Sequence, residues 1–250
     1  MKDKSVIITG ASRGIGEAAA RKFADLGAKV LLCARSTADI DRIASEINAN
    51  GGTALALATD VANHAQVQAA IDLAQSEFGS VDILINNAGV LEPVERIEHA
   101  TVSAWDTVID VNVKGVFYGI RAALPVMKSA GGGTIITIGS GAATSALEGW
   151  SAYNTSKAAV HHLNACLHGE EAANGIRALV LSPGTVATEM QRIIKKSGVN
   201  PVSTLEWEDH RHPSVIADTL AWMCTSDADE YLGDVVRQSD PEILTRLGQS

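Results

Sequence analysis

Residues 5 to 16 read Ser5-Val6-Ile7-Ile8-Thr9-Gly10-Ala11-Ser12-Arg13-Gly14-Ile15-Gly16, an apolar run that stops at three closely spaced glycines. We predict a strand over 5–9, a glycine turn, and a helix that starts behind the turn. Such a turn lets the backbone approach a bound group and directs free N–H groups and the positive end of a helix at it, which suits a pyrophosphate. The spacing G-x-x-x-G-x-G differs from the usual dinucleotide pattern G-x-G-x-x-G, and an ordinary strand-to-helix loop also contains glycines. The rest of the chain must decide between the two.

Apolar runs alternate with helical patterns along the rest of the chain. We predict strands over 5–9, 28–34, 54–58, 81–85, 134–138 and 176–181, and a seventh over 233–236. Helical patterns lie between them, at 17–26, 37–50, 64–78, 102–130 and 151–173. Repeated strand–helix–strand units and uninterrupted apolar strands indicate a parallel sheet that helices cover on both faces. The predicted fold class is therefore α/β, with a doubly wound parallel sheet.

The composition favours a single domain over residues 1–250 that acts on small molecules. The chain has 250 residues, 46% of them apolar, and a formal net charge of −9. That length can bury a large core, and the negative charge argues against sequence-independent binding to nucleic acid or anionic membranes. Cys33, Cys166 and Cys224 lack the spacing of a disulfide framework or a zinc site. Because the sequence shows no apolar leader and no apolar run near the ~18 residues of a membrane span, we expect a cytoplasmic protein.

Distinctive residues gather where the predicted strands end. In an open parallel sheet, the ligand lies outside the carboxyl ends of the strands. The first six strands end, in chain order, at Gly10, Arg35, Asp60, Asn87, Ser140 and Gly184. We therefore expect these residues to share one rim of the sheet and to form a binding site there.

Tyr153 and Lys157 stand four residues apart at the start of the second long helix, so both side chains project from one face. A phenol becomes a useful base at neutral pH when its pKa falls from near 10 to about 7, which requires roughly 4 kcal/mol. A cation about 4 Å away supplies roughly that amount in a partly exposed site. On these two residues alone, a surface Tyr and Lys at helical spacing is the simpler interpretation.

Several short motifs, in one order, resemble those of the short-chain dehydrogenase/reductase family. They are Thr9-Gly10-x-x-x-Gly14-x-Gly16, Asn86-Asn87-Ala88-Gly89, Asn112, Ser140, Tyr153-x-x-x-Lys157 and Pro183-Gly184. The resemblance covers residues 5 to 190 and implies a Rossmann-type sheet of seven strands. It also implies hydride transfer between a nicotinamide cofactor and a carbonyl or a secondary alcohol.

The resemblance implies a role for each catalytic candidate. Tyr153 would be the general acid in reduction and the base in oxidation, and Ser140 would donate a hydrogen bond to the substrate oxygen. Lys157 would lower the pKa of the tyrosine and hold the nicotinamide ribose, while Asn112 would bind a water that relays protons through Lys157. These roles agree with the chemical need for a donor aimed at the oxygen where negative charge develops.

The resemblance also implies a set of cofactor contacts. They are Gly10, Ser12, Arg13, Gly14, Ile15 and Gly16 in the turn; Asp60 and Val61 at the adenine; Asn87, Ala88, Tyr153 and Lys157 at the riboses; and Pro183, Gly184, Val186 and Thr188 near the carboxamide.

The end of the second strand decides between NAD and NADP. An acidic side chain there would accept hydrogen bonds from the ribose of NAD, but the segment Cys33-Ala34-Arg35-Ser36 carries none. Arg35 and Arg13 would instead converge on a 2′-phosphate, which guanidinium groups bind well. We therefore predict NADP(H), and we interpret Asp39 as a helix-start residue.

The substrate side is predicted to be apolar, with room for an aliphatic or aromatic ketone. Its lining would comprise Leu91, Ala142, Leu147, Trp150, Met190 and Ile193, although Trp150 also suits a core or an interface. We expect residues 189–212 to form a lid. The pair Lys195-Lys196 in that segment is more simply a solvated helix face than a docking site for an acidic partner.

The remaining histidines suggest no metal site. His210 and His212 lack further ligands nearby in the sequence. On the second long helix, we expect one of His161 and His162 to face a partner subunit and the other the solvent, and we expect Cys166 to pack.

The leading interpretation is an NADP-dependent carbonyl reductase or alcohol dehydrogenase. A 3-oxoacyl thioester (acyl-carrier-protein) reductase is the alternative enzyme, but it would need basic residues beside the mouth, which the acidic balance does not favour. The third alternative is a non-catalytic NADP-binding regulator, but such a protein would not need the Ser, Tyr, Lys and Asn set.

The resemblance implies a homo-oligomer, a tetramer or a dimer, with the two long helices at one interface. The carboxyl end, Val236-Arg237-Gln238-Ser239-Asp240-Pro241, departs from the family's acid-Gly-Gly run and leaves the second interface open.

Overall fold

The computed structural model describes residues 1–249, and within this range seven parallel strands form one sheet. The strands are β1 (Ser5–Thr9), β2 (Lys29–Ala34), β3 (Thr53–Ala58), β4 (Ile83–Asn86), β5 (Gly133–Ile138), β6 (Ile176–Ser182) and β7 (Val235–Arg237). Their order is β3-β2-β1-β4-β5-β6-β7. The predicted doubly wound Rossmann-type sheet is therefore confirmed, and every strand lies within two residues of its predicted bounds.

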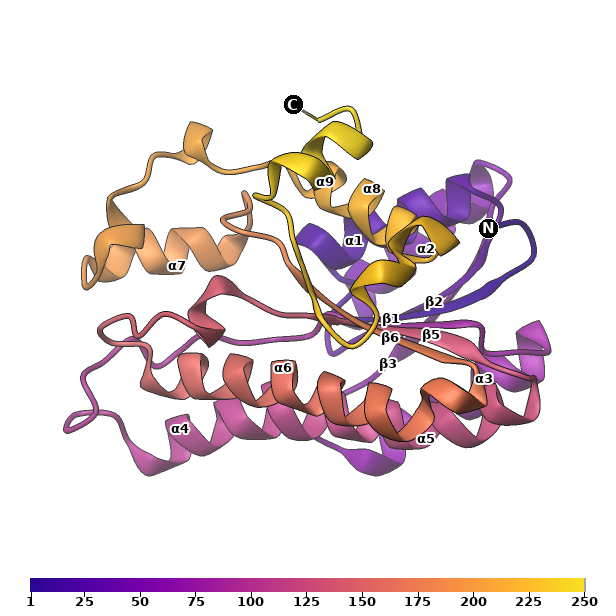
Figure 1. The fold of residues 1–250 in the computed structure, drawn as a ribbon, viewed down its shortest axis with the longest axis horizontal. Coiled ribbons are helices and arrows are strands. Elements are labelled where there is room, and N and C mark those ends of the chain that lie inside the picture. Colours follow the sequence, from indigo (N-terminus) through magenta and orange to yellow (C-terminus); the bar gives the residue numbers. More distant parts are fainter. Residues whose placement is uncertain (250) are drawn as a thin grey trace.

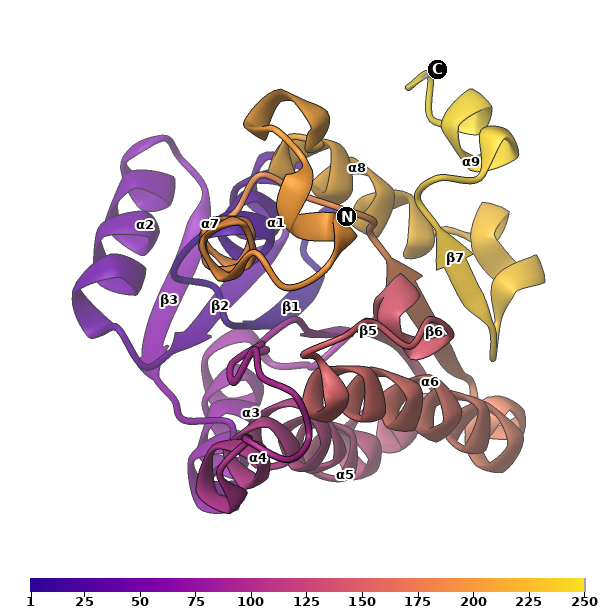
Figure 2. The ribbon, with the colours of Figure 1, turned by 90° about the vertical axis from the view of Figure 1, so that its left-hand side faces the viewer.

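Two layers of helices enclose the sheet (Figures 1 and 2). One layer comprises α1 (Gly14–Asp25), α2 (Thr37–Ala49) and α8 (Pro213–Met223). The other comprises α3 (His64–Phe78), α4 (Val102–Ile109), α5 (Gly115–Ser129) and α6 (Ser151–Glu171). The short helices α7 (Glu189–Ser197) and α9 (Pro241–Arg246) lie outside these layers.

Strand β1 shows why the apolar runs become central strands. Val6 and Ile8 are buried in the core beneath α1, α2 and α8, whereas Ile7 is buried in the core on the opposite face. Successive side chains of a strand point to opposite faces, so a strand that is covered on both sides must be apolar throughout. The uninterrupted sequence of β1 is the consequence.

The first long helix is interrupted, which the sequence pattern did not predict. Residues 102–130 were expected to form one helix, but a π-helical turn, Asp110–Lys114, separates α4 from α5. Such turns insert one residue into the ladder and often mark functional positions. Just beyond it, a Cβ on Gly115 would lie 2.9 Å from Cγ2 of Val61, so the helix closely approaches the loop after β3. The turn contains Asn112, whose buried side chain bonds to the backbone of Val90 in the loop after β4.

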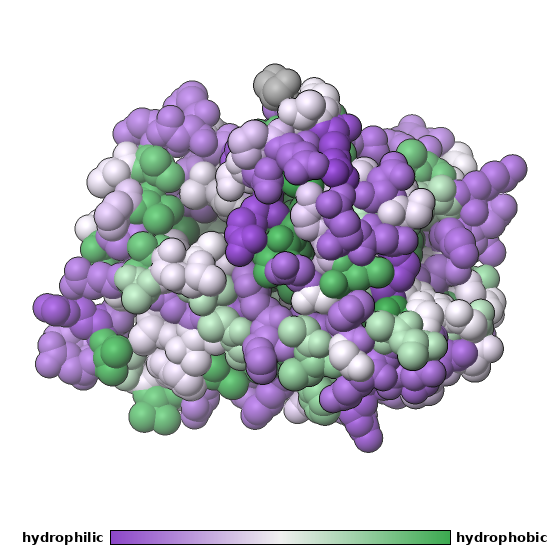
Figure 3. Space-filling model, in the orientation of Figure 1, coloured by the Kyte–Doolittle hydropathy of each residue, from purple (hydrophilic) through white to green (hydrophobic). Residues whose placement is uncertain are grey.

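The strand order creates a crevice beside β1. The chain leaves β1 toward β2 and β3 on one side, and returns through β4, β5 and β6 on the other. Ligands of open α/β sheets bind at this switch point, outside the carboxyl ends of the strands. Residues 189–212 lie above this rim: α7 stands apart from the main body in Figure 1, and Figure 3 shows apolar side chains on the surface around it. Among residues 1–249, no helix is both long and apolar enough to cross a membrane.

Candidate active site

A cleft of about 690 Å³ opens at the carboxyl ends of the strands and extends from the glycine turn to helix α7. Almost all the predicted cofactor contacts line it: Gly10, Ser12, Arg13, Gly14, Ile15, Arg35, Asp60, Val61, Asn87, Ala88, Tyr153, Lys157, Pro183, Gly184, Val186 and Thr188. Gly16 is instead buried behind the turn. The topology thus brings residues from six strand ends to one continuous surface.

The glycine turn is shaped by close backbone approach. Gly10 has φ +64°, and a Cβ on it would lie 2.8 Å from Cα of Ala88. A Cβ on Gly16 would lie 2.3 Å from the carbonyl oxygen of Gly10, so Gly16 is required for packing within the turn. The Asn87 amide donates to the carbonyls of Thr9 at 2.8 Å and Gly10 at 3.1 Å, and so fixes the turn from the next strand.

The same turn leaves the start of α1 free for an anion. Arg13 occupies the cap position with extended backbone and makes no side-chain capping bond. The first N–H groups of a helix carry partial positive charge and bind phosphates readily. The turn therefore fits the pyrophosphate of a dinucleotide.

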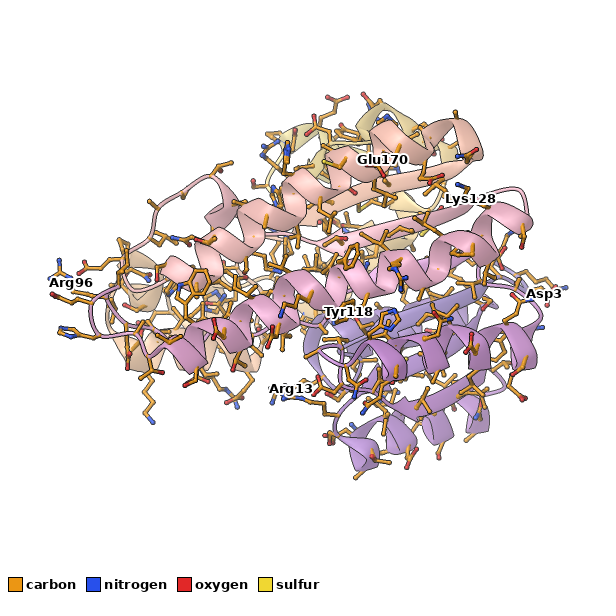
Figure 4. All side chains as sticks on the ribbon, turned by 90° about the horizontal axis from the view of Figure 1, so that it is seen from below. Asp3, Arg13, Arg96, Tyr118, Lys128 and Glu170 are labelled. Carbon is orange, nitrogen blue, oxygen red and sulfur yellow. The ribbon has the colours of Figure 1, made fainter. Side chains whose placement is uncertain are left out.

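Arg13 and Arg35 lie at one end of the cleft, and both side chains are exposed. Figure 4 shows Arg13 at the outer edge of the molecule. Within residues 1–249, neither guanidinium forms an ion pair. Asp39, in the first turn of α2, also borders the cleft, and its carboxylate accepts a hydrogen bond from Ser36 at 2.6 Å. Within the described residues, Arg13 and Arg35 thus lack an ion-pair partner, whereas the Asp39 carboxylate already accepts a hydrogen bond from Ser36.

The three hydroxyl and amine candidates meet in the middle of the cleft. Ser140 comes just after β5, and α6 carries Tyr153 and Lys157 one turn apart. The Ser140 Oγ accepts a hydrogen bond from the Ala142 N–H at 3.1 Å, which leaves the hydroxyl hydrogen for another acceptor. The Lys157 Nζ lies 5.6 Å from the centre of the Tyr153 ring. Both side chains on α6 are buried.

Burial has the largest effect on the pKa values of Tyr153 and Lys157. It raises the pKa of Tyr153, and an interaction with the Ser140 hydroxyl partly offsets that rise. It also lowers the pKa of Lys157 to about 8. The attraction between ammonium and phenolate favours a lower pKa of the tyrosine, but burial removes the phenolate from water and raises that pKa. The expected lowering of the Tyr153 pKa is therefore not found here, and the tyrosine is protonated at neutral pH.

Asn112 lies in the π-helical turn behind the cleft and does not line it. Its Oδ1 accepts from the Val90 N–H at 2.8 Å, and its Nδ2 donates to the Val90 carbonyl at 2.8 Å and to the Ser156 hydroxyl at 3.0 Å. Both amide hydrogens are thus used within the protein. The side chain joins the loop after β4 to helix α6.

The far end of the cleft is apolar. Ala142, Leu147, Trp150 and Met190 line it as predicted, whereas Leu91 and Ile193 pack behind that surface in the same apolar cluster. The Trp150 ring meets the Tyr153 ring edge to face, with centres 5.6 Å apart. Sequence reasoning missed Gln191, Ile194 and Val202, which also line the cleft. The spacing Met190 to Ile194, one helical turn, was the signal for this second lining residue.

Two expectations on α6 were wrong. His161 was expected to face a partner or the solvent, but its Nε2 accepts a hydrogen bond from the backbone N–H of Ser140 at 3.3 Å. Cys166 was expected to pack and is exposed. The i+4 spacing from Lys157 to His161 was the signal that placed the histidine on the cleft side. In the described part of the chain, no group of three metal-ligating side chains occurs.

The geometry agrees with the comparisons to known proteins. The family model described as short chain dehydrogenase matches residues 4–197. An uncharacterized oxidoreductase of Staphylococcus saprophyticus is 40% identical over 193 residues, which cover 76% of this chain and 77% of that one. An uncharacterized oxidoreductase of Listeria monocytogenes is 35% identical over 225 residues, with 89% and 90% covered.

Solved structures of similar fold include two that are named as reductases. A structure named levodione reductase superposes with a TM-score of 0.88 at 26% identity and covers 95% of this chain and 96% of that one. The structure of the KRED1-Pglu enzyme superposes with a TM-score of 0.83 at 31% identity, and the match covers 93% of this chain and 100% of that one. A 3-ketoacyl-(acyl-carrier-protein) reductase from Brucella melitensis, complexed with NADH, gives 0.83 at 31%, with 94% and 96% covered.

Proposed function

The chain belongs to the short-chain dehydrogenase/reductase family, and from that premise we propose that it is an NADP(H)-dependent oxidoreductase acting on a ketone or a secondary alcohol. One observation carries the proposal: Ser140, Tyr153 and Lys157 line a single cleft with the glycine turn. A regulator that merely bound the dinucleotide would need the turn but not the three side chains beside it.

The residues at the centre of the cleft suit carbonyl reduction. NADPH, when bound, supplies the hydride that reduces the carbonyl carbon. The carbonyl oxygen then gains negative charge, and the Ser140 hydroxyl can donate a hydrogen bond to it while the serine oxygen accepts from the Ala142 N–H. The raised pKa of Tyr153 keeps its proton in place at neutral pH, so it can be given to that oxygen. Lys157 provides the adjacent charge, and Asn112 holds α6 and the loop after β4 in position.

The preference for NADP rests on Arg13 and Arg35. Both are exposed at the adenosine end, and the Asp39 carboxylate is already bound by Ser36. A 2′-phosphate would give both guanidiniums a charged acceptor. The Brucella enzyme was solved with NADH, and its sequence is 31% identical to this chain, so the choice between NADH and NADPH has to be measured for this protein.

The substrate we propose is a hydrophobic ketone or the matching alcohol. The lining beyond Tyr153 is Ala142, Leu147, Trp150 and Met190, closed by the apolar side of α7. A 3-oxoacyl thioester is the second candidate, because one structural neighbour is named as such a reductase. Two of the basic side chains in the expected lid are already paired with acids, since Lys195 bonds to Glu206 at 2.6 Å and Arg192 to Glu189 at 3.2 Å.

A shallow groove between α5 and α6 supports a homo-oligomer, a dimer or a tetramer. Its apolar lining comprises Phe117, Ile120, Leu124, Pro125, Leu163, Cys166 and Leu167, and its charged rim comprises Arg121, Lys128 and Glu170. Figure 4 shows the two helices side by side, with Lys128 and Glu170 near one end. We propose that a second copy covers this face, and that the protein works in the cytoplasm.

The test is NADPH oxidation at about 340 nm against a panel of aliphatic and aromatic ketones and 3-oxoacyl thioesters. We expect turnover of ketones, and loss of turnover by about 10²- to 10⁴-fold in Tyr153→Phe because the general acid is gone. NADPH binding should survive that change. The variant Tyr118→Phe, on the outer side of α5, is the matched control. Turnover that is unchanged in Tyr153→Phe would contradict the proposal.

A further inference from the structure

His161 is bound to the backbone of Ser140. It lies on α6, one helical turn after Lys157 and two after Tyr153. The last cross-strand bond at this end of β5 runs from the Gly139 N–H to the Leu181 carbonyl at 2.7 Å. The next N–H, that of Ser140, donates to the His161 Nε2 at 3.3 Å, its one hydrogen-bond partner within residues 1–249. The imidazole thus provides the acceptor for the first backbone N–H beyond the hydrogen bonds of the sheet.

Gly139 leaves the space that the ring fills. A Cβ at this position would lie 2.2 Å from Nε2 of His161 and 2.5 Å from Cγ1 of Val180. Real Cβ atoms are not found at such separations, and neither neighbour is the far end of a long flexible side chain. Any side chain at position 139 would therefore push the imidazole away from Ser140.

The bond requires a neutral ring with its proton on Nδ1. Burial lowers the pKa of His161 to about 4, and the nearby cations Lys157 and Arg237 act in the same direction, while Asp234 opposes them. At neutral pH the imidazole is uncharged, and Nε2 then offers a lone pair to the serine N–H. Placing the proton on Nδ1 follows from this hydrogen bond.

The bond connects the two halves of the catalytic group. Ser140 belongs to the loop after β5, whereas Tyr153 and Lys157 belong to α6. His161 holds the serine N–H from α6, and the Ala142 N–H holds the serine Oγ from the loop. The Ala142 bond therefore orders the serine hydroxyl within its loop, and the His161 bond ties that loop to the helix that carries the tyrosine.

We propose that His161 is a positioning residue, which anchors the backbone of Ser140 to helix α6 and thereby sets the distance between the serine and tyrosine hydroxyls. Its effect on turnover rests on the proposed function, but the bond itself does not. His161 touches neither substrate nor cofactor in this proposal, and it acts through Ser140.

Two substitutions of His161 separate the hydrogen bond from packing. In His161→Gln, the side-chain oxygen can stand near the place of Nε2 and accept the same bond, whereas His161→Leu keeps bulk without an acceptor. We expect His161→Leu to lower kcat for ketone reduction by about 10- to 100-fold, because small misplacements of reacting groups have effects of that size. KM and the NADPH dissociation constant should stay within about threefold, and His161→Gln should keep most of the wild-type kcat.

The Ser140→Ala background shows whether the effect passes through the serine hydroxyl. There, His161→Leu should cause no further loss of kcat, because the group it positions is absent. An equal loss from His161→Leu in both backgrounds, or equal losses in the Leu and Gln variants, would overturn the proposal in favour of packing alone.

Nuclear magnetic resonance of the full chain tests the bond without any turnover. The ¹⁵N shift of His161 Nε2 should show an unprotonated nitrogen at neutral pH, and the Ser140 amide signal should move in His161→Leu but much less in His161→Gln. A protonated Nε2, or a Ser140 signal that ignores His161→Leu, overturns the inference whatever the activity. If the bond is seen but no carbonyl compound is reduced, the proposed function fails and the assigned bond stands.

Discussion

The ammonium nitrogen of Lys157 donates a hydrogen bond to the carbonyl oxygen of Ile138 at 2.7 Å. This bond ties helix α6 to the last residue of β5, two positions before Ser140. It uses one of the three ammonium hydrogens, so two remain for groups in the cleft. A buried cation with one fixed partner is held in place but poorly solvated, which explains its lowered pKa.

The pH dependence of reduction should follow Lys157. Because burial lowers its pKa to about 8, the side chain is charged below that pH and neutral above it. Tyr153 has a raised pKa and keeps its proton over the same range. We expect kcat/KM for ketone reduction to be level below pH 8 and to fall as the pH rises through about 8, when the charge that Lys157 holds beside the tyrosine disappears.

The variant Lys157→Arg is the control for this prediction, because arginine stays charged throughout the range. Whatever its absolute rate, its profile should lack the fall near pH 8. A wild-type profile that stays level up to pH 10 would show that Lys157 does not control the reaction.

Parallel strands were the part of the fold that the sequence predicted best. Val6, Ile7 and Ile8 must be apolar because both faces of β1 are covered, and this requirement is visible without coordinates. The rim positions follow from strand ends and topology alone, which is why Gly10, Ser140 and Gly184 meet as expected.

Contacts between distant side chains were not predictable in the same way. The π-helical turn at Asn112 depends on its bonds to Val90 and Ser156, which lie 22 and 44 residues away. The place of His161 depends on the missing side chain of Gly139. Helical periodicity indicates neither hydrogen bonds between distant residues nor the space that a missing side chain leaves. It also does not indicate how deeply Tyr153 is buried, and this burial raises its pKa.

Substitution of Arg35 should change the cofactor preference. In Arg35→Asp, a carboxylate replaces the guanidinium at the end of β2, where it would repel a 2′-phosphate and accept hydrogen bonds from a free ribose. We expect NADPH to bind about 10- to 100-fold more weakly, in line with the loss of a charged hydrogen bond, and NADH to bind more tightly. Titration calorimetry with both cofactors measures the change.

Arg96→Asp imposes the same change in net charge on an exposed arginine outside the cleft lining. It should leave both dissociation constants as they are. If the NADPH constant in Arg35→Asp matched that of the control, Arg35 would not contact the phosphate.

Removal of the Asn112 side chain should destabilise the protein. In Asn112→Ala, the N–H and carbonyl of Val90 lose their partner, and the Ser156 hydroxyl loses its donor. A buried group without a partner costs about 1–3 kcal/mol, so we expect the free energy of unfolding to fall by roughly 2–3 kcal/mol in urea titrations.

The exposed Asn174 supplies the comparison, because its side chain bonds to Glu171 alone among the described residues. Asn174→Ala should change the free energy of unfolding by less than about 0.5 kcal/mol. Equal midpoints for the two variants would contradict the bridging role of Asn112.

A substitution in the groove between α5 and α6 should change the oligomeric state. Leu124 and Phe117 both belong to its apolar lining, and Phe117 is 44% exposed. Leu124→Glu would place a carboxylate in the face that a second copy covers, and a charge buried without a partner is strongly unfavourable. We expect the variant to elute as a smaller species in size-exclusion chromatography with light scattering. Ile97→Glu is the matched control, since Ile97 is 78% exposed and lies outside the groove; it should keep the wild-type mass. A wild-type mass of one chain, or the same mass for Leu124→Glu and Ile97→Glu, would mean that this face is not an interface between copies.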